Sequence, residues 1–336
     1  MTAVGTPLVR VRRRAPRPGP AASVWLGFAL RRTVQLVAGV VVLATVVFLA
    51  LRAVPGDPAR RIAGADATEE YVQRLRLGLG LDRPLPEQYA TFMGDLATGD
   101  FGDSFTSGRP VVDVIGERLP ATASLAVAAF AVIMVSSLVL GLLAIAITRR
   151  RPGRTWERIF AGGTGTVASI PEFVASTYLI LFFAVFLSWL PAGGNQGLAA
   201  MVLPVAALSL RPVAVLTRIV RAEGLAAFES DYIRVARSKR LPARLIYLRH
   251  LLPNVLTSSL TVGGLLLGAM LGGTVIVENL FAWPGLGSQV VAAVVARDYT
   301  LVQGIVIVLG AAVLLINTLV DVVLAIADPR SLVAAP

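Results

Sequence analysis

The chain has 336 residues, of which 56% are hydrophobic and only 15% are charged, and its mean hydropathy is +0.75. Soluble domains carry a charge on about a quarter of their residues, so this composition excludes an ordinary soluble domain. One histidine and no cysteine exclude disulfides, clustered Cys or His metal ligands, and Cys- or His-based catalysis. The single lysine, Lys239, does not follow a Gly-rich loop, so the chain has no phosphate-binding P-loop and no catalytic motif is expected.

The net charge of +11 is distributed unevenly along the chain. Residues 1–32 carry seven Arg and no acid, and residues 149–158 carry five Arg, whereas residues 54–118 hold eleven acids against seven Arg. Short loops rich in Lys and Arg stay in the cytoplasm. We therefore expect both termini inside and residues 54–118 outside. Orientation in the lipid bilayer accounts for the positive charge, and no nucleic-acid partner is expected.

The first residues have the composition of a tail. Residues 1–28 are rich in Arg, Pro and Gly, which predicts a disordered cytoplasmic segment. The apolar run after Arg31-Arg32 imitates a signal peptide, but it is too long and lacks a small-residue cleavage site. We expect it to be retained as the first membrane span. The membrane domain is then predicted over residues 29–330, followed by a short C-terminal tail at residues 331–336.

Uncharged runs predict six transmembrane helices, because about 20 apolar residues cross a bilayer. The stretch "PAGGNQG" at residues 191–197 divides the longest run, since Gly and Pro mark turns. The predicted fold class is an all-α integral membrane protein. Its spans are expected at Leu30–Val54, Pro120–Ile147, Ile159–Leu190, Leu198–Leu216, Pro253–Val277 and Leu301–Ala325.

The acidic segment at residues 54–118 is predicted to be a helical extracytoplasmic insert between the first and second spans. Thr68, followed by Glu69 and Glu70, is a typical helix start, and "PLPEQYATFMGDLATGD" and "PVVDVIGERLP" each open with Pro. Apolar residues recur at helical spacing, which favours ordered structure over a solvated linker.

Two features of the spans are candidates for a translocation path. Pro171 and Glu172 lie in the middle of the third span, where Pro bends a helix and a carboxylate is costly unless it faces a polar cavity or a partner. The alternative is a packing kink with Glu172 near an interface. Gly264, Gly268 and Gly272 share one face of the fifth span and indicate close packing on the path or on a partner permease. Ordinary packing within the chain is the alternative.

A dense basic segment, residues 222–252, joins the fourth and fifth spans on the predicted cytoplasmic side. Ser230 and Asp231 begin a helix that is expected to run to about Lys239, and Pro242 redirects the chain into a second helix. So short an elbow cannot bury enough apolar area alone, which predicts that it binds a groove on another protein. A solvated basic loop is the alternative. The predicted binding face contains Tyr232, Val235, Ala236 and Lys239, flanked by Arg234 and Arg237.

This segment resembles the cytoplasmic "EAA" loop of ABC-importer permeases. "RVA" at Arg234–Ala236 stands where that family has Glu-Ala-Ala, and "HLLP" at His250–Pro253 matches its closing Ile-x-Leu-Pro. From residue 28 on, "VPGDPAR", "GDFGDSFTSGRPV", "SIPEF", "VENLFAWPGLG" and "ARDYTLVQG" follow in the order of the dipeptide, oligopeptide and nickel permease branch. Arg240 stands where the family usually has Gly, which permits a left-handed bend that costs other residues about 1 kcal/mol.

The resemblance implies a type I ABC importer permease of the MetI-like fold in a bacterial cell membrane. It implies a second homologous permease, two ATPase subunits that bind ATP and Mg, an extracytoplasmic solute-binding lipoprotein, and no cofactor in this chain. Peptides are the expected substrate, with nickel, glutathione or another small solute as alternatives. The residues implied to couple to the ATPase are Asp231, Tyr232, Arg234, Val235, Ala236, Arg237, Lys239, Arg240 and Leu241.

Two other classes compete with an ABC permease. A secondary transporter usually has acids or broken helices at the middle of the bilayer. Glu172 is the only good candidate for such an acid, and the basic elbow would have no role there. A membrane-embedded enzyme is disfavoured by the lack of Cys, the lone His and the absence of clustered intramembrane acids.

Overall fold

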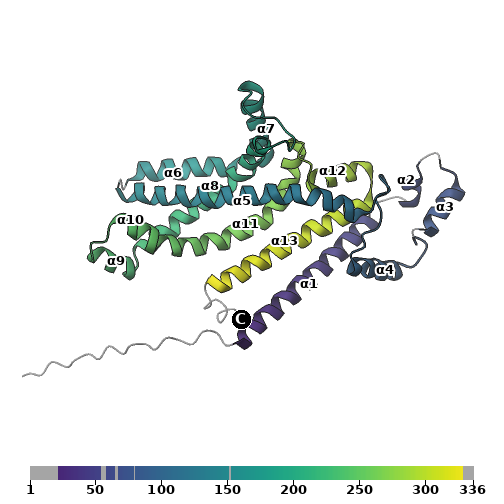
Figure 1. Ribbon diagram of the computed structural model, residues 1–336, viewed down its shortest axis with the longest axis horizontal. Coiled ribbons are helices and arrows are strands. Elements are labelled where there is room, and N and C mark those ends of the chain that lie inside the picture. The colour runs from purple at the N-terminus through teal and green to yellow at the C-terminus, as the bar shows by residue number, and fades with distance from the viewer. Residues whose placement is uncertain (1–21, 54–57, 65–66, 79, 151–152, 328–336) are drawn as a thin grey trace, which may run out of the picture.

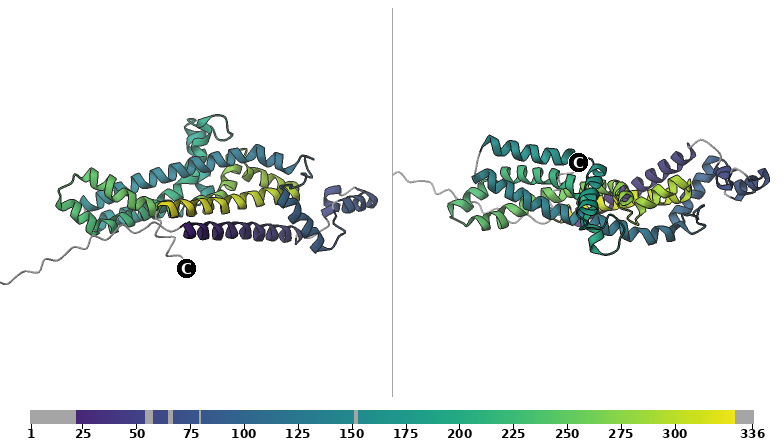
Figure 2. Two further views of the ribbon diagram at one scale, coloured as in Figure 1. Left: turned by 60° about the horizontal axis from the view of Figure 1, so that its bottom comes forward. Right: turned by 90° about the horizontal axis from the view of Figure 1, so that it is seen from above.

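The computed structural model describes residues 22–53, 58–64, 67–78, 80–150 and 153–327. Within these ranges the chain is helical, apart from loops and one isolated β-bridge between Asp103 and Pro110. Long helices lie side by side along the longest axis of the molecule, whereas α7 projects from the side of this bundle (Figure 1). Short helices cover both ends, α9 and α10 at one end and α2 to α4 at the other (Figure 2).

The long helices form the bundle. They are α1 (Ala22–Arg52), α5 (Val111–Arg150), α6 (Arg154–Ser169), α8 (Leu198–Phe228), α11 (Leu252–Leu280) and α13 (Tyr299–Ala327). The shorter elements are α2 (Pro58–Ala63), α3 (Glu69–Gly78), α4 (Leu85–Thr98), α7 (Glu172–Leu179), α9 (Asp231–Ser238), α10 (Ala243–Leu245), α12 (Leu286–Ala296) and the π-helices η1 (Ile180–Phe186) and η2 (Ile246–Leu251).

The core lies mainly between α5, α8 and α11. Leu125 and Ile133 of α5 and Leu208 and Leu216 of α8 are among its fully buried side chains. Gly141 lets α5 and α8 approach closely, because a Cβ at that position would collide with the side chain of Val220. Small residues at helix contacts are the usual means of close packing in membranes. These two helices therefore form the rigid centre on which the functional segments are mounted.

Four helices of the described chain are long and apolar enough to cross a membrane, namely α1, α5, α8 and α13. Two bent pairs bring the number to six if each pair is one span: α6 with α7 and η1, and α10 to α11. The all-helical membrane fold is as predicted. The side of the membrane on which each end lies remains a prediction from the charge distribution.

Two predicted boundaries were wrong. Helix α1 begins at Ala22, so residues 22–28 are helical rather than part of the tail, and residues 1–21 and 331–336 lie outside the described ranges. The segment at residues 111–118 is not a separate helix, because α5 runs through Pro120 without a break. Packing of Val111 and Ile115 against Leu286 and Ile305 supports this first part of α5 and offsets the one hydrogen bond that Pro removes.

The third predicted span is sharply bent. Helix α6 meets the helix made by α7 and η1 at 91°. Ile170 and Pro171 both have extended backbones, with ψ of 120° and 146°. A residue before Pro is driven out of the helical region by the Pro ring, so the helix ends there. The bend that Pro171 predicts within residues 159–190 is therefore present, and it is a sharp one.

Candidate functional sites

The basic elbow forms one end of the bundle, where α8 ends and α9 follows (Figure 1). The exposed side chains of Asp231 and Arg234 form an ion pair within α9 at 3.3 Å. Ser230 directly precedes α9, at the predicted helix start, but its hydroxyl donates to the carbonyl of Ala227 in the preceding helix and does not cap α9. The predicted helix itself is present and ends at Ser238, with Lys239 following it.

Helix α9 has one buried and one exposed face. Ile233 and Ala236, three residues apart, are buried in the core. Tyr232 is 43% exposed and Val235 is 52% exposed, although both side chains are large and apolar. The prediction that Ala236 shares the outward face with these two residues was wrong. Ala236 is turned away from Val235 on the helix, and it packs against the chain's own core. Tyr232 and Val235 are therefore the apolar part of the exposed face, which they share with charged side chains, and Lys239 lies beyond the end of the helix.

The ring of Phe228 joins the elbow to the bundle. The guanidinium carbon of Arg149 in α5 lies 4.0 Å from the ring centroid, and that of Arg237 in α9 lies 5.1 Å from it. Tyr247 of η2 contacts the same ring edge-on, with centroids 5.2 Å apart. Cations over an aromatic face are attracted by its electron density. One buried ring thus connects α5, α8, α9 and η2.

Arg240 makes the sharp bend after α9. Its φ is +53°, which is the left-handed region, and its amide donates to the carbonyl of Arg237 at 2.8 Å. The amide of Leu241 donates to the carbonyl of Ala236 at 3.3 Å, which closes the helix end, and the Leu241 side chain packs against the core. The bend that Gly permits in related loops is therefore made here by Arg, at a cost of about 1 kcal/mol.

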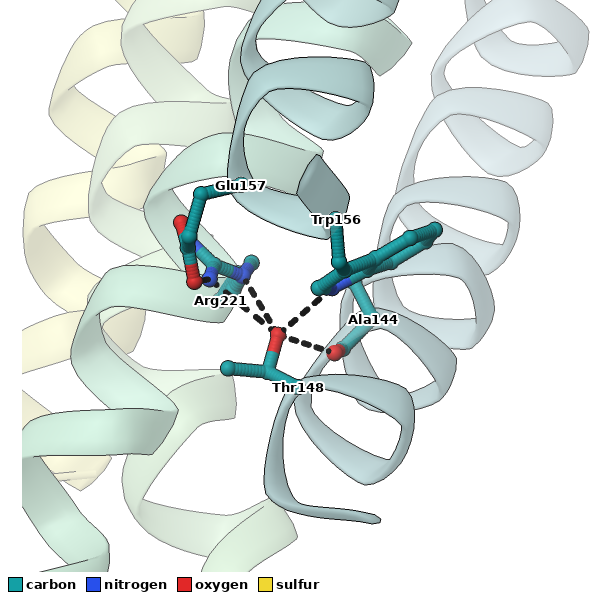
Figure 3. A network of polar contacts seen from close by, with 5 residues as sticks. All are labelled: Ala144, Thr148, Trp156, Glu157 and Arg221. Carbon is teal, nitrogen blue, oxygen red and sulfur yellow. Dashed lines mark hydrogen bonds and ion pairs between the residues drawn. The ribbon is translucent and has the colours of Figure 1, made fainter. Parts of the chain in front are cut away.

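A polar network holds α5, α6 and α8 together near the elbow (Figure 3). The hydroxyl of Thr148 accepts hydrogen bonds from Trp156 Nε1 at 2.8 Å and from the guanidinium of Arg221 at 3.1 and 3.2 Å, and it donates to the carbonyl of Ala144 at 2.8 Å. Arg221 also pairs with Glu157. Because Thr148 and Arg221 each bond to both of the other helices, these three helix ends are held as one unit.

The carboxylate of Glu172 lies against α11. Glu172 is the first residue of α7, directly after the bend at Pro171. A Cβ at Gly273 would be 2.6 Å from Glu172 Oε2, so only Gly leaves room for this side chain. Pro171 and Glu172 therefore lie at the junction of α6, α7 and α11. Whether this junction lines a path stays a prediction.

Three glycines of α11, Gly264, Gly268 and Gly272, do not share one environment: two pack against α13 and the third is exposed. A Cβ at Gly264 would collide with Val320 of α13, and a Cβ at Gly268 would be 2.9 Å from Asn317 Oδ1 of the same helix. These two glycines pack within the chain, which was the alternative interpretation. Gly272 is exposed and meets no described atom within 4 Å of an added Cβ, so a role on the path or at a partner remains a prediction for it alone.

Sequence reasoning missed a carboxylate network at the opposite end of the bundle. Glu278, at the end of α11, is fully buried and accepts hydrogen bonds from Thr122 Oγ1 at 2.7 Å and from the amide of Ser288 at 3.1 Å. Thr122 Oγ1 accepts from the amide of Leu286 at 2.8 Å, and Gly285 leaves room because a Cβ there would collide with the carboxylate. The motif "VENLFAWPGLG" was noted, but nothing local indicates that Thr122 contacts it.

A second carboxylate fastens the insert to the start of α13. Asp298 Oδ2 accepts from Ser104 Oγ at 2.5 Å and from the amide of Thr106 at 3.1 Å, and Oδ1 accepts from the amides of Leu301 at 3.1 Å and Phe105 at 3.3 Å. Burial alone would raise the pKa of Asp298. The hydrogen bonds to its charged form outweigh burial and lower the pKa below its ordinary value of 3.8.

Residues 137–333 match the family described as the binding-protein-dependent transport system inner membrane component, and residues 25–126 match the N-terminal part of such membrane components. The chain is similar to a putative peptide transport system permease protein of Brucella abortus, with 37% identity over 313 residues that cover 90% of this chain and 97% of the relative. It is also similar to the glutathione transport system permease protein of Escherichia coli strain K12, with 34% identity over 304 residues, 90% of this chain and 98% of the relative.

One solved structure, the MetNI methionine ABC transporter in inward-facing conformations, contains a chain with a similar arrangement of helices. The TM-score is 0.55 at 19% sequence identity, and the match covers 65% of this chain and 97% of that one. At this level of identity the likeness concerns the fold alone.

Proposed function

The chain belongs to the family of inner-membrane components of binding-protein-dependent transport systems, and we propose that it carries peptides across the membrane. It is a multi-pass permease subunit of a bacterial ABC importer. Subunits of this family transport solutes and are not themselves enzymes, so energy from ATP must reach the chain through contact with another protein.

One observation carries the proposal that ATP drives this chain through a partner: one face of α9 is buried in the core, and the other is exposed. Ile233 and Ala236 attach the helix to the core, while Tyr232 and Val235 remain exposed on a helix of only eight residues. Large apolar side chains that remain exposed beside charged ones are typical of a surface that binds a partner. We assign this exposed face to the ATPase subunit.

The contacts of α9 provide a route for its motion. A displacement of α9 changes the position of Arg237 on the ring of Phe228, and the same ring contacts Arg149 of α5. Helix α5 continues to the other end of the bundle, where Thr122 bonds to Glu278. Two ATPase subunits would move two such elbows, one on this chain and one on a second permease, and an extracytoplasmic binding protein would deliver the solute.

Peptides are the substrate class that the relatives favour. One similar permease is named for peptide transport and another for glutathione, which is itself a tripeptide. Nickel has less support from this chain, because the described residues contain no group of three or more His, Asp or Glu that could hold a metal ion. We therefore propose di- or oligopeptides as the solute.

The test is a reconstituted importer containing the binding protein, both permeases and the ATPase subunits. Val235→Glu places a charge in the centre of the proposed interface, and Leu77→Glu makes the same change at a residue of α3 that is 63% exposed. We expect Val235→Glu to lose ATPase binding and ATP-driven uptake of a radiolabelled dipeptide, while Leu77→Glu keeps both. Equal uptake by the two variants would contradict the assignment of α9, and uptake of a non-peptide solute alone would contradict the substrate class.

A further inference from the structure

A cavity of about 300 Å³ opens at the end of the bundle that carries the insert. It lies between the end of α1, the helix α4, the segment at residues 100–105 and the start of α13. This position is remote from α9 and from the bend at Pro171 (Figure 1). Sites for small ligands are typically concave, mostly apolar, and equipped with a few polar groups that orient the ligand.

The floor of the cavity is aromatic. Phe48 of α1 is buried, and its ring stacks on that of Phe92 of α4 with centroids 5.4 Å apart. Phe101 packs on the same apolar cluster and also lines the cavity. Such rings supply a flat surface on which apolar side chains of different sizes can lie.

Positive charge gathers at one edge of the cavity. Gln88 of α4 holds this edge together, because it accepts a hydrogen bond from the guanidinium of Arg52 and donates to the carbonyl of Arg83 at 2.7 Å. Both arginines line the cavity. Guanidinium groups are well suited to bind a carboxylate.

Negative charge gathers at the other edge. Asp95 follows Gln88 by seven residues and Phe92 by three, so all three lie on the same face of α4. Gly99, with φ of +79°, ends the helix and turns the chain back, so that the amide of Asp100 donates to the carbonyl of Asp95 at 2.9 Å. Asp95 and Asp100 therefore lie close together in the chain, about two helical turns along α4 from Gln88.

The two charged edges are held apart. Among the ion pairs of the described residues, none joins Arg52 or Arg83 to Asp95 or Asp100. Along α4, the seven residues from Gln88 to Asp95 span roughly 10 Å at about 1.5 Å per residue. An extended chain covers about 3.3–3.6 Å per residue, so a peptide of two or three residues spans roughly 7–10 Å.

The α13 wall adds a hydrogen-bond donor. Gln303 lines the cavity, and its Nε2 atom is one of the buried side-chain atoms in the described part of the chain that lack a hydrogen-bond partner. A buried donor without an acceptor costs about 1–3 kcal/mol. The carbonyl of a bound peptide would supply the missing acceptor once the Gln303 side chain turns toward the cavity.

We propose that this cavity binds short zwitterionic peptides, with the carboxylate at Arg52 and Arg83 and the ammonium group at Asp95 and Asp100. The inference rests on the proposed peptide transport and adds a receiving site beside the path. Peptide side chains lie on Phe92 and Phe101, and Gln303 turns toward the cavity to donate to a peptide carbonyl. The cavity offers both positive and negative side chains, at a spacing that fits a peptide of two or three residues. A lipid tail or a free anion would not use both kinds of charge.

The experiment measures peptide binding to the purified importer in lipid nanodiscs without its binding protein. The probes are radiolabelled Ala-Phe-Ala and the same tripeptide with its amine acetylated, both followed by equilibrium dialysis. We expect acetylation and Asp95→Asn each to weaken binding about tenfold or more, the loss expected for a hydrogen bond to a charged group. Glu87→Gln removes one charge from the same helix outside the cavity and should leave binding unchanged. Asp95→Asn should not weaken binding of the acetylated peptide further.

Three outcomes would overturn the inference. Equal binding of the free and acetylated peptides would exclude recognition of the ammonium group, and unchanged binding to Asp95→Asn would exclude the acidic edge. Weaker docking of the binding protein to Asp95→Asn, with peptide binding intact, would assign the cavity to that protein instead. ATP-driven uptake of the tripeptide in the complete importer is measured separately. Uptake without binding at the cavity would leave the proposed function standing and remove only this site.

Discussion

The elbow and the opposite end of the bundle are attached by different kinds of contact. At the α9 end, the elbow is attached through Ile233, Ala236 and the ring of Phe228 between two arginines. At the opposite end, Glu278 and Asp298 each accept several directional hydrogen bonds from separate elements. Apolar and cation–ring contacts tolerate small rotations, whereas buried hydrogen bonds hold one geometry.

This difference in the kind of contact agrees with the function proposed for each region. An elbow that transmits the movement of an ATPase must shift without breaking a buried polar network. The opposite end must keep α5, α11, α12 and the insert aligned while a solute is received. We therefore regard the elbow as the moving part and the Glu278 and Asp298 networks as the fixed frame, and each prediction below tests one side of that contrast.

The largest effect is expected from Glu278→Ala. This change leaves Thr122 Oγ1 and the amide of Ser288 without their acceptor in a buried site. Since each such group costs about 1–3 kcal/mol, the free energy of unfolding should fall by about 2–6 kcal/mol. Thermal unfolding of the purified chain in nanodiscs measures the loss. Glu70→Ala, at an exposed side chain, is the control and should change little. A loss no larger than that of the control would remove Glu278 from the fixed frame.

Asp298→Asn should destabilise the chain less, by about 1.5–3 kcal/mol, the range for hydrogen bonds to a charged group. The pKa of Asp298 is lowered in the folded chain, so its contribution is present above the ordinary value of 3.8 and is lost as the pH falls through the lowered pKa. The stability difference between the unmodified chain and Asp298→Asn should therefore be full near about pH 7 and shrink below about pH 4. A difference that does not change over this range would contradict the role of the charged form.

Phe228→Leu tests the moving part. Leu keeps an apolar side chain but removes the ring that Arg149 and Arg237 contact, which should cost about 1–2 kcal/mol for two cation–ring contacts. The specific expectation is functional: ATP hydrolysis should continue while the number of ATP molecules used per peptide rises. Phe228→Tyr keeps the ring and should restore the ratio. Unchanged coupling in Phe228→Leu would show that the ring only packs.

The smallest effect is expected from Arg240→Gly. Arg240 has φ of +53°, a conformation that Gly adopts without strain. We expect the elbow to gain about 1 kcal/mol of stability, measured as slower proteolysis after Arg237 or Lys239. Faster proteolysis in the Gly variant would mean that the Arg240 side chain stabilises the bend.

Much of the fold could be predicted from the sequence because membrane spans are long and uniform in composition. The elbow was placed correctly from its charge and from Pro242, and Thr68 lies directly before α3, as predicted, with its hydroxyl accepting from the amide of Tyr71 at 3.4 Å. The bend at Pro171 was also anticipated. Its angle of 91° was not, since the angle depends on how α7 packs against α8 and α11.

The misplaced face of Ala236 and the missed carboxylate networks share one cause, which is contact between residues far apart in the sequence. The outward assignment of Ala236 relied on helical spacing alone, whereas burial against the core decides its face. Thr122 and Glu278 are 156 residues apart, and Ser104 and Asp298 are 194 apart. Local patterns carry no information on such pairs, so the fixed frame was found only in the structure.

Cysteine labelling tests the central claim, that the exposed face of α9 binds the ATPase subunits in the cytoplasm. Because the chain has no native Cys, Val235→Cys, Ala236→Cys and Leu77→Cys each give a single reporter. In intact cells, an impermeant thiol reagent should modify Leu77→Cys only.

The decisive measurement is the labelling rate of Val235→Cys in permeabilised membranes, with and without the ATPase subunits. We predict rapid labelling without them and at least about tenfold slower labelling with them, as expected for a side chain buried in an interface of even modest stability. Ala236→Cys should label slowly in both conditions, because that position is already buried. Labelling of Val235→Cys that is equally fast with bound ATPase, or that occurs in intact cells, would contradict the account.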